Sequence, residues 1–398
     1  MILRILRFLG NAVLVLLPLA ALGCIFPRIP VFGELGPVVT SPFGPWLVLL
    51  SLAGAVLVFR RWLANRRKRT LALAVLAVFA GLGTVSFLGR QIVVARDNGI
   101  HIDLGEALLT GSQADETLMP TTVVYARHDG VALPLDIYQP AKRQDLGPAP
   151  MFVYIHGGGW GAETLKQRQA DYRWFAERGY LVISLEYTLS SETRVTWNVA
   201  EPELACALAW VGANAARLGG DPGLLALWGE SAGGNLVLNL SYRANAGKLD
   251  SACPGALPHV AATIALYPVI DPARMYHNPD LLIGVFGRTM TRNYTGGTPE
   301  QFPDRYAAIG SATHINAKAP PTLLIVPEAD HLVAPEAAYD FATRARTAGI
   351  DTRLIRMPFA EHAFDLRSGS IGNQLVRQAM LQFLQAHGLG AQPIGEPK

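Results

Sequence analysis

The sequence predicts an α/β fold with a mostly parallel sheet, helices on both faces of that sheet, and three transmembrane helices before it. Two observations predict this organisation. The first part of the chain contains long apolar stretches without charged residues. From Thr121 onward, short apolar runs alternate with helical patterns of a dozen or more residues, which is the order that a parallel sheet requires.

The apolar stretches are long enough to cross a lipid bilayer. Residues 8–27 and 70–89 carry no charge, and the stretch between them has its densest apolar part at 43–59. A helix of about 20 apolar residues spans the hydrocarbon core of a membrane. We therefore expect residues 1–95 to form a membrane region with three transmembrane helices, which makes the lipid bilayer a partner of the protein.

Basic residues orient these helices. Residues 1–96 contain 11 of the 34 Lys and Arg residues and one of the 31 acidic residues. Eight of these basic residues precede the first span or lie in the loop 60–69, and the positive-inside rule assigns both segments to the cytoplasm. The N-terminus is expected to be cytoplasmic, and the chain after the third span extracytoplasmic, on the periplasmic or extracellular side. This exported part has a net charge of −7, so a nucleic-acid partner is not expected.

The three cysteines predict no metal site. Cys24 is expected to be an apolar residue of the first membrane helix rather than a site of lipid attachment. Cys206 falls on the apolar face of a helical pattern and is expected to be free and buried, although an exported domain permits a disulfide with Cys253. Neither a CxxC nor an HExxH spacing occurs, so neither a metal nor another cofactor is expected.

The exported part is expected to consist of a connector over residues 96–120 and one catalytic domain over residues 121–390. A hairpin over 121–126 and 131–140 opens the domain and makes the sheet mixed. The other expected elements follow in this order: strand 151–155, helix 166–179, strand 180–187, helix 201–219, strand 224–228, helix 233–247, strand 261–269, an irregular stretch 271–318, strand 321–327, helix 334–349, strand 351–358 and a C-terminal helix from about Asn373.

A candidate nucleophile follows the strand 224–228. Gly229 and Gly233 flank Ser231 two residues away on either side, in the pattern G-x-S-x-G between a strand and a helix. A serine on so tight a turn needs small neighbours, because larger side chains would collide. The turn also places the hydroxyl at the helix N-terminus, where negative charge is favoured. The pattern therefore predicts that Ser231 is the nucleophile.

A glycine-rich stretch, "HGGGW" at residues 156–160, follows an earlier strand and predicts an oxyanion hole. Acyl transfer passes through a tetrahedral oxyanion, which needs backbone N–H donors that already point at it. Glycines let the backbone approach the substrate to hydrogen-bonding distance. The expected donors are the N–H groups of Gly157, Gly158 and Ala232. His156 lies on this loop and is expected to be structural rather than catalytic.

These motifs, together with the order of strands and helices, resemble the α/β-hydrolase superfamily. Within it, the hormone-sensitive-lipase-like and feruloyl-esterase-like carboxylesterases are the most similar. The resemblance covers residues 121–388 and excludes the membrane region. It implies a catalytic triad in the chain order serine, acid, histidine, with the acid after the seventh strand and the histidine after the eighth.

The resemblance assigns the other two members of the triad. Asp330 follows the expected seventh strand and is the expected acid, and His362 follows the eighth and is the expected base. Glu328 and His331 lie nearby and remain alternatives. The chain has Pro327 where relatives often have Gly, a difference that bears on the shape of the acid loop. It also has "EHAF" where "HGF" is more frequent, a change without an expected consequence.

The triad predicts the chemistry of a serine esterase. His362 takes the proton from Ser231, the hydroxyl attacks the ester carbonyl, and Asp330 orients the imidazolium that forms. The expected protein is a membrane-anchored serine hydrolase that cleaves carboxylic esters, with a small-molecule or cell-envelope ester as substrate. Two alternatives, a serine peptidase and an acyltransferase, would use the same triad. A third, a non-catalytic membrane scaffold, predicts a broken triad, whereas all three members are present.

Overall fold

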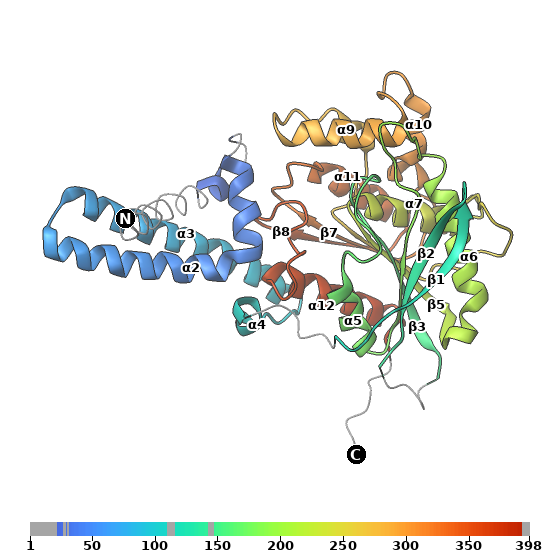
Figure 1. Cartoon of the computed structure of the whole chain (residues 1–398), viewed down its shortest axis with the longest axis horizontal. Helices are drawn as coiled ribbons and strands as arrows, with labels where there is room; N and C mark the ends of the chain where they lie inside the picture. Colours follow the sequence, from blue (N-terminus) through green and yellow to red (C-terminus); the bar gives the residue numbers. More distant parts are fainter. Residues whose placement is uncertain (1–21, 27–28, 30–31, 110–115, 142–146, 392–398) are drawn as a thin grey trace, which may run out of the picture. The chain divides into compact units, whose positions relative to one another are not determined.

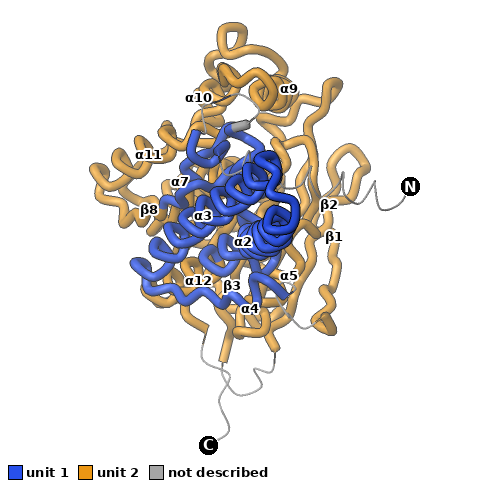
Figure 2. The backbone as a smooth tube through the Cα atoms, turned by 90° about the vertical axis from the view of Figure 1, so that its left-hand side faces the viewer, with its two compact units in different colours: residues 1–111, 327–331, 356–376 blue, residues 112–326, 332–355, 377–398 orange. Residues whose placement is uncertain are grey.

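The computed structural model describes most of the chain (Figure 1). The described residues are 22–26, 29, 32–109, 116–141 and 147–391. They form two compact units, coloured separately in Figure 2. Unit 1 comprises residues 1–111, 327–331 and 356–376, and unit 2 comprises residues 112–326, 332–355 and 377–398. Unit 1 therefore contains the N-terminal helices together with the two short segments in which the acid and the histidine were expected.

Two long helices form a hairpin in unit 1. They are α2 (Phe32–Asn65) and α3 (Lys68–Asp97), and both are long and apolar enough to cross a membrane. Small side chains line their contact, since Ala74 and Ala77 pack against Val58. Small side chains let the backbones of two helices approach closely, which is typical of helix pairs in membranes. A short helix, α4 (Leu104–Leu109), follows.

The expected second and third spans lie within this hairpin. α2 contains all of residues 43–59 and α3 all of residues 70–89. The first expected span, residues 8–27, lies outside the described residues except for its last part, 22–26, of which 22–25 are helical.

One sheet of eight strands, in the order β1-β2-β4-β3-β5-β6-β7-β8, belongs to unit 2 except for the last residue of β7 and the last two of β8. β1 pairs with β2, and β2 with β4, in antiparallel fashion, whereas the pairs β4–β3, β3–β5, β5–β6 and β6–β7 are parallel. The expected α/β class with a mixed, mostly parallel sheet is thereby confirmed. The strands are β1 (Thr121–His128), β2 (Val131–Tyr138), β3 (Ala149–Ile155), β4 (Leu181–Leu185), β5 (Gly220–Glu230), β6 (Ala262–Leu266), β7 (Thr322–Pro327) and β8 (Thr352–Met357).

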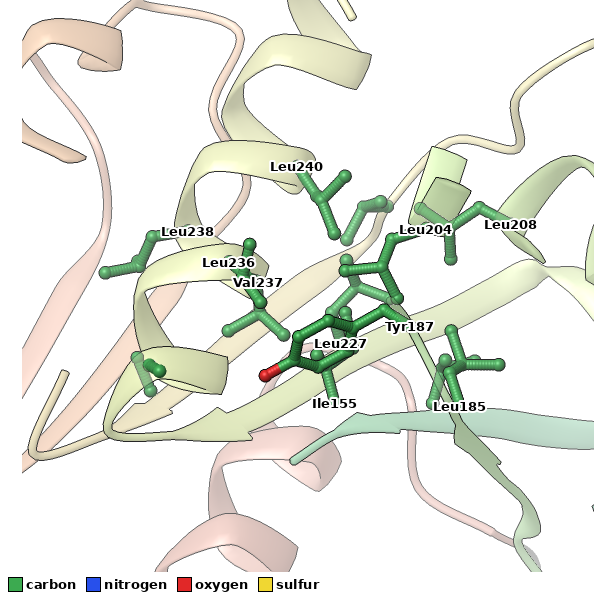
Figure 3. Packing of buried hydrophobic residues seen from close by; sticks show 14 of the residues in the cluster. Ile155, Leu185, Tyr187, Leu204, Leu208, Leu227, Leu236, Val237, Leu238 and Leu240 are labelled. Atoms are coloured by element: carbon green, nitrogen blue, oxygen red, sulfur yellow. The ribbon is translucent and has the colours of Figure 1, made fainter. Parts of the chain in front are cut away.

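The central strands are buried on both faces, because helices cover the sheet on either side. On one face, Ile155 and Leu227 pack with Leu204 and Leu236 from two helices (Figure 3). On the other face, alternate residues form an aromatic layer, in which the ring of Phe152 contacts Trp228 and Phe175. The covering helices are α5 (Gln169–Glu177), α6 (Ala200–Asn214), α7 (Ala232–Ala246), α11 (Pro335–Thr347) and α12 (Ile371–Ala386).

The stretch 271–318, expected to be irregular, is largely helical, so that prediction was wrong. It contains α8 (Pro272–Tyr276), α9 (Ile283–Thr295) and α10 (Pro303–Ile309). Two of these helices begin with a proline, which is suited to the first helical position but resembles a loop signal in the sequence. Gly and Thr residues within α9 lower its intrinsic helix propensity.

Cys206 is not free, which corrects the sequence-based expectation. It forms a disulfide with Cys253, with a Cα–Cα distance of 5.0 Å. The loop after α7 returns alongside α6, where the N–H of Ala252 donates to the carbonyl of Pro202 at 3.0 Å. The helical pattern of α6 predicted correctly that Cys206 is buried. It could not predict that the loop after α7 brings Cys253 to it.

Removal of this disulfide is expected to destabilise the protein. The bridge closes a loop of 47 residues, and the chain-entropy relation gives a loss of about 4 kcal/mol for a loop of that size. The double variant Cys206→Ala, Cys253→Ala should therefore unfold at a lower temperature than the wild type. Reductant should bring the wild type to the value of the variant and leave the variant unchanged. A wild type whose unfolding temperature is insensitive to reductant would contradict this prediction.

Candidate active site

Ser231 occupies a strained turn between β5 and α7. Its backbone angles are φ 52° and ψ −119°, and a positive φ is costly for any residue except glycine. Its N–H donates to the carbonyl of Leu266 at the end of β6, at 2.9 Å. The residue retains 8% of its surface. The turn thus fixes the backbone of Ser231 at the end of a buried strand and at the N-terminus of a helix.

The two glycines around Ser231 are required by space. A Cβ atom on Gly229 would lie 2.4 Å from the carbonyl oxygen of Gly233. One on Gly233 would lie 2.1 Å from the carbonyl oxygen of Ile155 and 2.5 Å from that of His156. All three obstacles are backbone atoms, so no rotation of a side chain can relieve them. The turn, strand β3 and the loop after β3 therefore touch backbone to backbone.

Gly233→Ala is expected to destabilise unit 2 severely. Overpacking of a well-packed site costs about 1–3 kcal/mol, and a backbone obstacle at 2.1 Å places this variant at or above the upper end. The matched control is Gly223→Ala on the exposed start of β5, where a Cβ would meet only a side-chain oxygen of Asp221 at 3.2 Å. Thermal unfolding of both variants checks the prediction. Equal unfolding temperatures for the two would contradict it.

The glycine loop after β3 lies directly beside Ser231. A Cβ on Gly157 would lie 3.3 Å from the Cβ of Ser231. Gly158 and the next glycine have left-handed φ angles of 83° and 58°, which only glycine adopts at little cost. Among the described residues, no hydrogen bond uses the N–H groups of Gly157, Gly158 or Ala232. These three donors, expected for the oxyanion hole, are therefore not engaged by the described part of the chain.

His156 supports this loop from below. The residue is fully buried, its Nε2 lies 2.8 Å from a carboxylate oxygen of Glu186, and its ring stacks on Tyr187. The Tyr187 hydroxyl donates to the carbonyls of His156 and Gly157 at 3.2 and 3.3 Å. Burial raises the pKa of the Tyr187 phenol well above its usual range, which keeps it a donor. These contacts fit the structural role expected for His156.

Helix α9 packs against the glycine loop. The Sδ atom of Met290 lies 2.4 Å from the position that a Cβ on Gly159 would occupy. The ring of Trp160 stacks on Tyr294, with 4.5 Å between the ring centroids and 3° between the planes. Helix α9, which carries no sequence motif, thus contributes two side chains to the surroundings of the glycine loop.

Glu230, the residue before Ser231, carries a buried polar network that the sequence motif did not reveal. Its carboxylate pairs with Arg168 and accepts a hydrogen bond of 2.6 Å from the Tyr154 hydroxyl. Arg168 also donates to the hydroxyl of Tyr267 at 2.7 Å and to Asp171 at 3.1 Å. Buried acids are almost always paired. The glutamate within "GESAGG" is Glu230, and its place in a buried motif was the sequence signal that a basic partner must lie nearby.

The expected acid and base meet within unit 1. Nδ1 of His362 lies 2.8 Å from Oδ2 of Asp330, and the side chains are 14% and 1% exposed. The loops that carry them are joined directly, because the N–H of Ala329 donates to the carbonyl of Ala360 at 3.0 Å. Glu328, one alternative for the acid, instead pairs with an arginine on the strand β8.

His331, the other alternative, pairs with Glu361, a residue that the sequence analysis did not single out. Glu361 also accepts the backbone N–H of His331 at 2.7 Å and that of His362 at 2.9 Å. The Glu361 carboxylate thus connects the loop after β7, which carries Asp330, with the loop after β8, which carries His362. The glutamate of "EHAF", where "HGF" is more frequent, supplies this connection.

Glu361→Gln is expected to change the pH dependence of stability. Burial raises the pKa of the Glu361 carboxyl above its ordinary value of 4.5, so the folded state favours the protonated form. The stability that this effect contributes is fully present below pH 4.5 and is lost as the pH rises through the raised pKa. Gln cannot ionise, so the unfolding temperature of the variant should rise relative to the wild type between pH 4 and pH 8. A difference that stays constant over this range would contradict the prediction.

The expected site residues thus form two groups. Ser231 and the glycine loop belong to unit 2, and Asp330 with His362 belongs to unit 1. Within the described part of the chain, no group of three or more His, Cys, Asp or Glu side chains could hold a metal ion. A serine in this strained turn, beside a glycine loop and on a sheet of this order, defines the class of protein: it is an α/β-hydrolase.

Comparison with known proteins names the family. Residues 135–344, just over half of the chain, match the BD-FAE family, and the chain belongs to it. Esterase LipQ of Mycobacterium tuberculosis is 28% identical over 63% of this chain and 58% of its own length. The probable carboxylic ester hydrolase LipM of the same organism is 29% identical over 79% of this chain and 78% of its own.

A solved structure shows the same fold. The esterase Est2 of Thermogutta terrifontis superimposes with a TM-score of 0.59 and 26% identity, over 71% of this chain and 96% of its own. The family, the relatives and this structure together place the chain among the carboxylesterase-type hydrolases.

Proposed function

We propose that this protein is a membrane-anchored serine esterase that hydrolyses carboxylic esters through Ser231, His362 and Asp330. The observation that carries the proposal is the strained Ser231 beside a glycine loop, in which the N–H groups of Gly157 and Gly158 donate to no acceptor in the described chain. Strain at a single non-glycine residue persists only where the surroundings enforce it, and it is concentrated at functional sites. The esterase relatives support the ester as the substrate bond.

The proposed mechanism follows from the two groups of residues. His362 removes the proton from the Ser231 hydroxyl, and the oxygen attacks the ester carbonyl. Asp330 holds Nδ1 of His362, which fixes the tautomer of the ring and stabilises the imidazolium. The N–H groups of Gly157, Gly158 and Ala232 provide the donors for the oxyanion. His362 then protonates the leaving alcohol, and water releases the acyl group by the reverse sequence.

The proposed anchor is the N-terminal region, with residues 1–95 in the membrane, 96–120 as connector and 121–390 as the catalytic domain. Two helices with mean hydropathies of 2.0 and 2.3 support it. The basic loop between them supports a cytoplasmic side for that loop and an extracytoplasmic side for the hydrolase. The disulfide of unit 2 also supports an exported hydrolase, because disulfides persist in oxidising compartments.

The proposed substrates are small carboxylic esters, free or attached to the cell envelope. Est2 of Thermogutta terrifontis has been solved with propionate and with butyrate bound. These acids support short acyl groups as the first substrates to try.

The test uses the full chain, solubilised in detergent, with p-nitrophenyl esters from acetyl to dodecanoyl. Hydrolysis should be fastest for the short acyl groups, and paraoxon should abolish it with one adduct located on Ser231 by mass spectrometry. A protein that is labelled at Ser231 but hydrolyses none of the esters would overturn ester hydrolysis. Peptides and acyl acceptors other than water would then be the substrates to test.

A further inference from the structure

We propose that the N-terminal helical hairpin is a positioning element for His362 as well as an anchor. Gln91 of α3 holds the start of the loop that carries His362, and Arg367 ties the end of that loop to the N-terminal helices. We define the histidine loop as residues 358–370, between β8 and α12. The inference rests on the proposed function, because it assigns to these contacts the task of keeping His362 in its catalytic orientation. All the contacts lie within unit 1.

The start of the histidine loop is held by the end of α3. Gln91 is 2% exposed, and its Nε2 donates to the carbonyl of Pro358 at 3.1 Å. Phe87 lies one helical turn earlier on the same face of α3. Its ring contacts that of Phe359 at a centroid distance of 4.7 Å. Two adjacent loop residues, three and four positions before His362, are thus attached to the hairpin.

The end of the histidine loop is held by α2 and α4. Nη1 of Arg367 donates to the carbonyl of Pro42 in α2 at 3.1 Å and to that of Ala107 in α4 at 2.9 Å. The last four carbonyls of a helix receive no hydrogen bond from within the helix. Arg367 supplies a donor to one of these, the carbonyl of Ala107 in α4. The guanidinium also lies 5.8 Å from the ring centroid of Phe43.

The loop between these attachments contains two residues with strained backbone angles. Phe359 and Ala363 have positive φ angles of 55° and 60°, and neither is a glycine. Each such residue raises the free energy of the folded state and persists only when its surroundings over-determine it. His362 lies between them. Loss of an attachment should therefore let the strained residues relax and turn the imidazole away from its working orientation.

The expected consequence is a slower chemical step. A displacement of about 1 Å in a catalytic group can cost about 100-fold in rate. The inference assigns Gln91 and Arg367 no contact with substrate, so KM should change little. Both helices of the hairpin are long and apolar enough to span a bilayer, so these contacts would link the proposed anchor to His362.

The experiment measures kcat per active site in the full chain, in detergent, with a p-nitrophenyl ester. Active sites are counted by titration with a fluorophosphonate. Gln91→Leu removes the donor at nearly constant volume, and Arg367→Ala removes both bonds at the other end. Each should lower kcat per titrated site about 10- to 100-fold with KM unchanged, and Arg367→Lys should recover part of the loss.

The controls remove similar groups that do not touch the histidine loop. Thr84→Val deletes a buried hydroxyl on α3 that, among the described residues, bonds only to the carbonyl of Ala80 in its own helix. Arg346→Ala deletes an arginine of α11, whose side chain donates to the carbonyl of Thr352 in β8 at 2.9 Å. Both controls should keep the wild-type kcat per titrated site.

The outcomes separate this inference from the function on which it rests. If Gln91→Leu and Arg367→Ala lose titratable sites but keep kcat per site within twofold, the contacts are merely structural and the inference is wrong. The wild type would still be an esterase in that case. If the wild type hydrolyses no ester, the proposed function fails before the variants are compared.

Discussion

Ser231→Ala is expected to lower kcat for ester hydrolysis by about 10⁶-fold, because loss of a triad nucleophile costs about as much as loss of the whole triad. The variant should fold, since alanine is smaller than serine and fits the same space. It also keeps the backbone hydrogen bond from residue 231 to Leu266. KM should stay close to the wild-type value. The steady-state rate at saturating p-nitrophenyl ester, measured for the full chain of both proteins in the same detergent, would give the change.

The control for this variant is Ser191→Ala, at an exposed serine outside the glycine loop and the turn. It should retain wild-type activity and labelling by paraoxon. If Ser231→Ala hydrolysed esters within tenfold of the wild type, Ser231 would not be the nucleophile, and another serine would have to be sought.

Asp330→Asn is expected to lower kcat by about 10⁴-fold. The carboxylate lies 2.8 Å from Nδ1 of His362, and it stabilises the tautomer that leaves the other ring nitrogen free to act as a base. Asparagine keeps the size of the side chain and can present its N–H₂ group instead, which favours the wrong tautomer. The loss should therefore appear in kcat rather than in unfolding temperature or in KM.

Glu328→Gln is the matched control, since Glu328 is the neighbouring acid on the same loop and pairs with Arg356 at 2.9 Å. It should stay within about twofold of the wild type, as expected for a surface ion pair. The reverse result, with Glu328→Gln inactive and Asp330→Asn active, would move the acid to Glu328.

The sequence predicted the sheet because its signal is local. All seven residues of β3 are buried, and such a strand appears as a continuous apolar run whatever packs on it. The glycines around Ser231 were equally legible, because the collisions that exclude side chains there involve backbone atoms close to the turn. Features set by composition or by a tight turn can be inferred from a short stretch of chain.

The features that the sequence did not predict depend on residues far apart. Glu361 stands next to His362, but its partner His331 lies 30 positions earlier. Cys206 and Cys253 meet only because the loop after α7 returns to α6. The contact of Gln91 with Pro358 spans 267 positions. No periodicity within one element predicts such pairs, since they form only when elements distant in the chain pack together.

The redox state of Cys206 and Cys253 reports which compartment the hydrolase has reached, because their disulfide persists only in an oxidising one. The chain has three cysteines, and only two of them can be bridged, because Cys24 carries a free thiol. Denatured protein treated with a maleimide polymer would therefore gain one label if it had reached an oxidising compartment and three if it had remained in the cytoplasm. A single gel could thus determine the topology of the anchor from the mass of the product, without a reporter fusion.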